Sequence, residues 1–135
     1  HTRTVVLEWQ GGLRFSGGSP GGPTLLLDAD DQAAPGPMRA LLLAAAACSG
    51  ADVVSILEKM RVHLTRFRTR VDGQRRPEHP RRYRSLHLTF ELAGDGLDEA
   101  KARRAIDLSL GKYCSVIHSL NPDIAVTYDL RLEPA

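Results

Sequence analysis

The chain has 135 residues, of which 42% are hydrophobic and 25% are charged, and its formal net charge is +2. A chain of this length can bury one core without covalent staples, so we expect a single domain over residues 1–135. The composition is that of an ordinary globular protein, which excludes a disordered chain and a histone-like nucleic-acid binder. We therefore expect no nucleic-acid partner.

The longest apolar run, residues 40–47, lies in mid-chain. It is much shorter than the roughly 20 residues that a membrane-spanning helix needs, and residue 1 does not open a signal peptide. These features predict a cytoplasmic protein without a membrane partner. In a reducing compartment, Cys48 and Cys114 are not expected to form a persistent structural disulfide. Buried inert thiols, a catalytic pair or half a metal site remain open.

The N-terminal part of the chain is rich in β-branched and aromatic residues, separated by glycine. Gly11 and Gly12 predict a tight turn between two strands, and residues 16–23 form a second dense turn signal. The predicted strands cover residues 3–9, 13–15 and 24–27. Together they predict a β-meander, followed by a polar loop over residues 28–36.

One long helix is predicted over residues 37–60. Pro37 suits the first turn of a helix, where its missing N–H would be unpaired anyway. The sequence is apolar on nearly every helical face as far as Cys48, which indicates a helix buried all round. Beyond Cys48, apolar residues recur at amphipathic spacing as far as Met60.

Two long strands are predicted next, over residues 62–71 and 83–92. The second alternates apolar residues with polar ones, as a strand with one buried face does. Asp98 is predicted to cap a second helix, which Gly111 is expected to break before another helical turn begins near Cys114. A final strand is predicted over residues 124–130. This order of elements predicts an α+β fold.

Either cysteine alone is most often a small core hydrophobe. A two-thiol peroxidase needs one low-pKa thiolate to attack the peroxide and a second thiol to resolve the sulfenic acid as a disulfide. Such a pair must bring its Cα atoms within about 7 Å. Cys48 and Cys114 both fall at predicted helical positions flanked by small or polar residues, which keeps the catalytic interpretation open.

Two segments around these cysteines, residues 37–57 and 105–116, resemble the two cysteine motifs of the OsmC/Ohr family. This family is named for osmotically inducible protein C and organic hydroperoxide resistance protein. The resemblance extends from Trp9 to Leu132. It implies antiparallel sheets around long central helices, in an intertwined homodimer.

The resemblance also implies a mechanism. Cys48 would attack organic hydroperoxides, Cys114 would resolve the oxidised cysteine, and an external dithiol of the lipoyl type would re-reduce the pair. Neither a metal nor a bound cofactor is implied. The family's organic-hydroperoxide branch has Glu ten positions before the first cysteine, where this chain has Met38 beside Arg39. The chain therefore resembles a less characterised OsmC-like branch.

In the organic-hydroperoxide branch, that Glu works with an N-terminal Arg to hold the thiolate. Arg14 is the candidate cation for Cys48, and the competing interpretation makes it a solvated strand residue. Arg39 has the same two interpretations.

A basic stripe is the strongest competing surface signal. Arginines recur with period two over residues 66–70 and cluster over residues 75–84. They fit either a site for phosphates or anionic lipid, or a solvated outer hairpin. His118 lies four residues after Cys114, but no second close ligand pair accompanies it, so a metal site is not predicted.

Two functions therefore remain. One is a thiol peroxidase, and the other is a catalytically weak stress protein that binds a small-molecule or lipid ligand.

Overall fold

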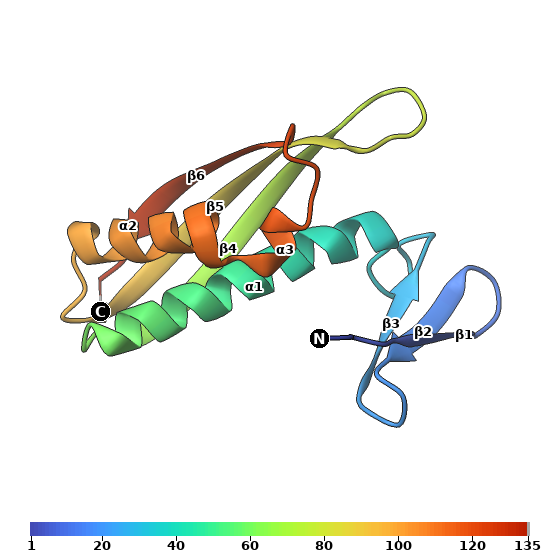
Figure 1. Cartoon of the computed structure of the whole chain (residues 1–135), viewed down its shortest axis with the longest axis horizontal. Helices are drawn as coiled ribbons and strands as arrows, with labels where there is room; N and C mark the ends of the chain where they lie inside the picture. The colour runs from blue at the N-terminus through green and yellow to red at the C-terminus, as the bar shows by residue number, and fades with distance from the viewer. Residues whose placement is uncertain (135) are drawn as a thin grey trace. The chain divides into compact units, whose positions relative to one another are not determined.

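The computed structural model describes residues 1–134 and divides the chain into two compact units, His1–Leu41 and the part from Leu42 onward (Figure 1). We describe each unit by itself. The α+β class is confirmed, because each unit contains a three-stranded sheet and helices accompany the second. The single domain over residues 1–135 stays a prediction.

The first unit is a meander of three antiparallel strands, β1 (Val6–Trp9), β2 (Arg14–Gly18) and β3 (Thr24–Asp28). The predicted turn between β1 and β2 is confirmed. Gly11 and Gly12 have φ angles of 98° and 58° there, a region that glycine enters at little cost. The prediction of a turn from residue 16 onward is wrong in part. Ser16 to Gly18 pair with β3, and cross-strand hydrogen bonds there outweigh the weak strand preference of glycine.

Helix α1 (Pro37–Lys59) confirms the predicted long helix. Its buried residues lie on one helical face: Ala45, Ser49, Gly50, Val53 and Leu57. The expectation of a helix buried on all sides is not met within one chain, because Leu43 is 58% exposed and Val54 is 41% exposed. By length and composition alone, α1 is also long and apolar enough to cross a membrane. The comparison with a membrane-spanning helix made from residues 40–47 was too short, because the length of the whole helix, rather than of its longest apolar run, decides whether it could cross a membrane.

The second sheet contains β4 (His63–Arg75), β5 (Tyr83–Asp95) and β6 (Ala125–Leu132). The alternation predicted for β5 is confirmed, because four of its side chains are fully buried, at Leu86, Leu88, Phe90 and Leu92. Strands β4 and β5 extend beyond residues 71 and 92, where the sequence predicted them to end. Their backbone hydrogen bonds to each other continue past the residues with the apolar pattern.

The expectation of purely antiparallel sheets is wrong for this unit. Strands β4 and β5 are antiparallel, but β5 and β6 are parallel. Parallel neighbours need a long crossover connection. The helical segment between Asp95 and Ala125 supplies it.

That crossover contains α2 (Glu99–Leu108), the π-helical turn η1 (Ser109–Tyr113) and the short helix α3 (Ser115–His118). The predicted cap is confirmed, since the Asp98 carboxylate accepts the Lys101 N–H at 2.8 Å. The predicted break at Gly111 is wrong, because Gly111 lies inside η1 and the backbone becomes extended only at Cys114. Figure 1 shows α1 and α2 over one face of the β4–β5–β6 sheet.

Candidate thiol site

Cys48 lies in the regular middle part of α1 and is half-buried. Two residues further along, the helix approaches β4 closely. A Cβ atom at Gly50 would stand 3.2 Å from the Phe67 ring, tighter than most real contacts. On the same face, the buried Ser49 hydroxyl donates to the Ala45 carbonyl at 2.8 Å. Cys48 is therefore held on a helix that packs directly against the sheet.

Cys114 occupies the junction between η1 and α3 and is completely buried. Its N–H donates to the Ser109 carbonyl at 2.8 Å, which closes the π-helical turn. Its own carbonyl lies 2.8 Å from Nδ1 of His118. Local hydrogen bonds on both sides thus fix the backbone that carries the thiol.

The structure brings the two thiols together. Burial raises the pKa of Cys114 to about 11, the N–H of Ile117 acts against this, and a hydrogen bond and charge interaction with Cys48 raise it further. The charge of Asp52 contributes in the same direction. Both cysteines are free rather than joined in a disulfide. The site therefore consists of a buried, protonated thiol beside a more accessible one.

Two polar residues of this site were missed from the sequence, Asp52 and Ser109. The Ser109 hydroxyl donates to Oδ2 of Asp52 at 2.8 Å, and it joins η1 to α1. Asp52 lies four residues after Cys48, and residues at that spacing share a helical face. That spacing was the available signal. Its importance depended on Ser109, which is distant in the sequence.

The OsmC family model, described as OsmC-like protein, matches residues 29–129. The chain belongs to this family. Protein YhfA of Escherichia coli (strain K12) is 38% identical over 130 residues, covering 96% of this chain and 97% of that protein. A crystal structure of a hypothetical protein from Aquifex aeolicus VF5 has 27% identity and a TM-score of 0.84, with 98% of each chain covered.

The organic hydroperoxide resistance protein OhrB of Bacillus subtilis has the same fold. Its structure aligns with a TM-score of 0.63 at 18% identity, over 97% of this chain and 98% of that one. The similarity to YhfA and to OsmC-like structures confirms the prediction that the chain belongs to a less characterised OsmC-like branch.

The candidate arginines of this OsmC-like chain lie in the first unit. Arg14 begins β2 and is exposed. Hydrogen bonds from the N–H groups of Ala33 and Asp30 lower the pKa of Asp28, and the charge of Arg14 adds to this effect. Arg39 forms a 3.0 Å ion pair with Asp31. A role for Arg14 at the thiol site stays a prediction.

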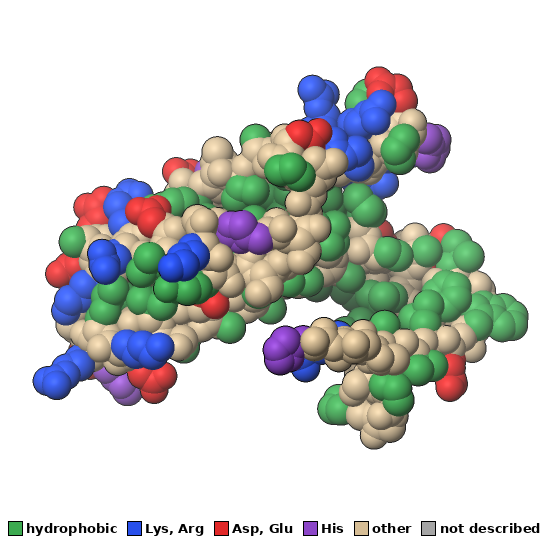
Figure 2. Space-filling model, viewed as in Figure 1, with side chains coloured by type: hydrophobic (Ala, Val, Ile, Leu, Met, Phe, Trp, Pro, Cys, Tyr) green, Lys and Arg blue, Asp and Glu red, His purple; other side chains and the backbone are tan. Residues whose placement is uncertain are grey.

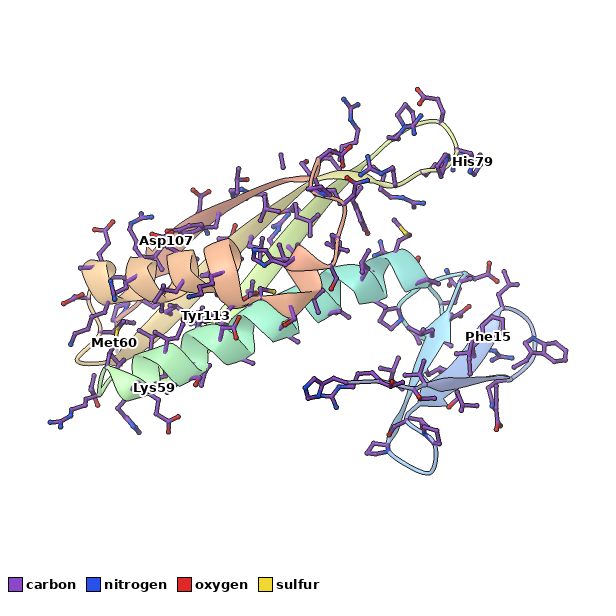
Figure 3. The ribbon with its side chains drawn as sticks, in the orientation of Figure 1. Phe15, Lys59, Met60, His79, Asp107 and Tyr113 are labelled. Carbon is purple, nitrogen blue, oxygen red and sulfur yellow. The ribbon has the colours of Figure 1, made fainter. Side chains whose placement is uncertain are left out.

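The basic hairpin carries many ion pairs of its own. Arg70 pairs with Asp72, and Arg68 lies 3.5 Å from Glu91. At the tip, marked by His79 in Figure 3, basic and acidic side chains mix, and Figure 2 shows both colours there. The geometry favours a solvated outer hairpin. Over residues 1–134, no group of three His, Cys, Asp or Glu side chains could hold a metal ion.

Proposed function

We propose that this OsmC-like protein is a thiol-dependent peroxidase that reduces organic hydroperoxides. The observation that carries the proposal is the meeting of a half-buried Cys48 with a fully buried Cys114 at one site. The more exposed thiol is the one that a peroxide can reach. The buried thiol is protected from direct oxidation and stands ready for the second step.

The proposed reaction has three balanced steps. The Cys48 thiolate attacks one peroxide oxygen, so an S–O bond forms, the O–O bond breaks, and the alkoxide leaves and is protonated to an alcohol. Cys114 then attacks the Cys48 sulfenic acid, an S–S bond forms, and the departing hydroxide leaves as water with the thiol proton. An external dithiol of the lipoyl type then reduces the disulfide by exchange and is itself oxidised. Arg14 is retained in this proposal as the cation that favours the Cys48 thiolate.

The test uses one equivalent of an alkyl hydroperoxide on the reduced protein, followed by mass-spectrometric mapping of both thiols. We expect a Cys48–Cys114 disulfide that forms faster than free cysteine reacts. Cys48→Ser should abolish peroxide consumption. The matched variant Cys114→Ser should still consume one equivalent and stop at the sulfenic acid. Full consumption by Cys48→Ser would overturn the proposal.

A ligand-binding function is the second candidate, and an apolar hollow beside α3 favours it. This hollow has a volume of about 260 Å³ and is lined mainly by Ile117, Leu120, Ile124 and Val126. Small-molecule sites in proteins are concave and mostly apolar in this way. Two untouched thiols after peroxide treatment, together with a specific small molecule or lipid recovered by native mass spectrometry, would favour binding over peroxidase activity.

We also propose that the protein works as a cytoplasmic homodimer. The exposed face of α1 carries apolar side chains that include Leu43 and Val54, and a second copy would bury them. Sedimentation should show a dimer that Leu43→Lys weakens. The matched substitution Ala100→Lys, at an exposed position on α2, should leave it intact. A monomeric wild type would contradict this assembly.

A further inference from the structure

The helical segment before Cys114 changes its register. Its buried residues follow α-helical spacing through Ala102, Ala105, Ile106 and Ser109. Continuation of that spacing would bury the residue four positions after Ser109. That residue is Tyr113, labelled in Figure 3, and it is 49% exposed. The buried position is occupied instead by Cys114, at 0% exposure.

The π-helical turn is the cause of this change. The N–H of Cys114 bonds to the carbonyl of Ser109, five residues earlier, rather than to the residue four positions before it. The turn therefore contains one extra residue. Because each residue advances an α-helix by about 100°, one extra residue decides which side chain faces α1. In this π-helical register, Cys114 faces Cys48.

The residue that begins this turn is tied to α1 by its side chain. The hydroxyl of Ser109, itself 0% exposed, donates to the Asp52 carboxylate at 2.8 Å. Asp52 lies one helical turn beyond Cys48. A continuous series of hydrogen bonds thus runs from the Cys114 backbone through Ser109 to α1, and it ends beside the other thiol.

We propose that Ser109 and Asp52 are positioning residues for disulfide formation, because their hydrogen bond holds η1 in the register that presents Cys114 to Cys48. This inference rests on the proposed thiol chemistry and names two residues that it requires. Neither residue contacts the peroxide in this role. Ser109 fixes the backbone of Cys114, and Asp52 anchors Ser109.

Asp52 has a second effect through its charge. The groups that act on the Cys114 thiol come from two elements: α1 presents Cys48 and Asp52, and α3 presents the N–H of Ile117. The ring of His118, also on α3, lies against the Cys114 carbonyl. Burial is the first cause of the raised pKa of Cys114, and the Asp52 carboxylate adds to it. Removing that negative charge lowers the pKa, so the pH profile of disulfide formation should move toward lower pH.

The experiment separates closure of the disulfide from peroxide reduction. The reduced protein is treated with diamide, an oxidant that needs no peroxidase activity, and closure of the Cys48–Cys114 disulfide is followed by quenched mass spectrometry. In Ser109→Ala we expect the disulfide to form at least about tenfold more slowly, because small misplacements of reacting groups lower reaction rates by this factor or more. Ser109→Thr keeps the hydroxyl and should restore most of the rate. Ser115→Ala, at an exposed serine beside Cys114, is the matched control.

Asp52→Asn keeps an accepting oxygen and removes the charge. In this variant we expect the disulfide to form at a rate within a few-fold of the wild-type rate. The pH profile of disulfide formation should move to lower pH, which loss of the hydrogen bond alone would not cause. Equal closure rates in wild type, Ser109→Ala and Asp52→Asn at every pH would overturn the inference. Closure by diamide without any reaction with peroxide would instead overturn the proposed peroxidase function and leave the positioning role standing.

Discussion

The two cysteines are carried by helical segments that are built differently. Around Cys48, α1 keeps a regular α-helical register over 23 residues, and its buried side chains follow that spacing. Around Cys114, α2 passes into the π-helical turn η1, and the buried side chains lose α-helical spacing. One thiol is thus placed by ordinary helix geometry, and the other by a local departure from it.

This difference shows that the thiol pair is assembled from one regular helix and one irregular helical turn. A regular helix against a sheet is stabilised by many contacts and holds its residues with little freedom. A π-helical turn is rare and depends on specific hydrogen bonds that stabilise it. We therefore expect the Cys48 side of the site to respond to packing changes and the Cys114 side to respond to changes in hydrogen bonding and charge.

The largest expected effect comes from the sheet that supports both segments. Phe90 is fully buried, and its ring makes edge contacts with Phe67 and Tyr128 at centroid distances of 6.2 Å. Phe90→Ala should lower the free energy of unfolding by about 3–5 kcal/mol, through lost burial and the cavity left behind. Urea denaturation measures this. Thr89→Ala, on the other face of β5, should lower the free energy of unfolding far less. An equal loss in the two variants would contradict the assignment of the buried face of β5.

Ionisation of Cys114 should destabilise the fold at high pH. Burial raises the pKa of this thiol from an ordinary value of 9.0 to about 11, so the folded state favours the protonated form. The contribution is fully present below pH 9 and is lost as pH rises through 11, by up to about 2–3 kcal/mol.

The measurement compares unfolding free energies across this pH range in wild type and in the two serine variants. In Cys114→Ser, the loss of stability that comes from ionisation of the Cys114 thiol at high pH should be absent. Cys48→Ser should keep most of it, because burial of Cys114 remains. Parallel curves for all three proteins would contradict the contrast between the two thiols.

The packing of α1 against β4 is tested at Gly50, two residues after Cys48. A Cβ atom there would meet two Phe67 ring atoms at 3.2 and 3.3 Å. Gly50→Val adds branched bulk where α1 packs against Phe67 of β4, and we expect the free energy of unfolding to fall by about 1–3 kcal/mol in thermal or urea unfolding. Wild-type stability in this variant would show that α1 can move away from the sheet.

The smallest expected effect is at Gly111, the glycine of the π-helical turn. A Cβ atom there would meet nothing within 4 Å. Gly111→Ala should therefore stabilise the protein by at most about 1 kcal/mol, through the better helical propensity of alanine. Unfolding measurements test this, and the rate of disulfide closure should not change. Destabilisation would mean that η1 requires the flexibility of glycine.

Several elements could be predicted because their signals are local. The alternation in β5, the cap at Asp98 and the long helix from Pro37 all depend on residues a few positions apart. The strand bounds, the break assigned to Gly111 and the purely antiparallel sheet were wrong because each depends on a partner elsewhere. The extension of β4 requires β5, and the parallel direction of β6 requires the whole crossover.

The candidate site divides in the same way. Two cysteine segments typical of the family were visible in the sequence, but Asp52 and Ser109 were not, because a carboxylate and a serine 57 residues apart show no local pattern. The role of Arg14 stays a prediction.

The sequence by itself determined the α+β class, the family and the two cysteines, because helical and strand periodicities are short-range and the cysteine motifs are contiguous. Only the tertiary structure decided that Cys114 rather than Tyr113 turns toward α1. That choice depends on the Ser109–Asp52 hydrogen bond and on burial of the thiol against another helix. Such interactions form only when distant segments pack together, so their energies cannot be assigned to either segment alone.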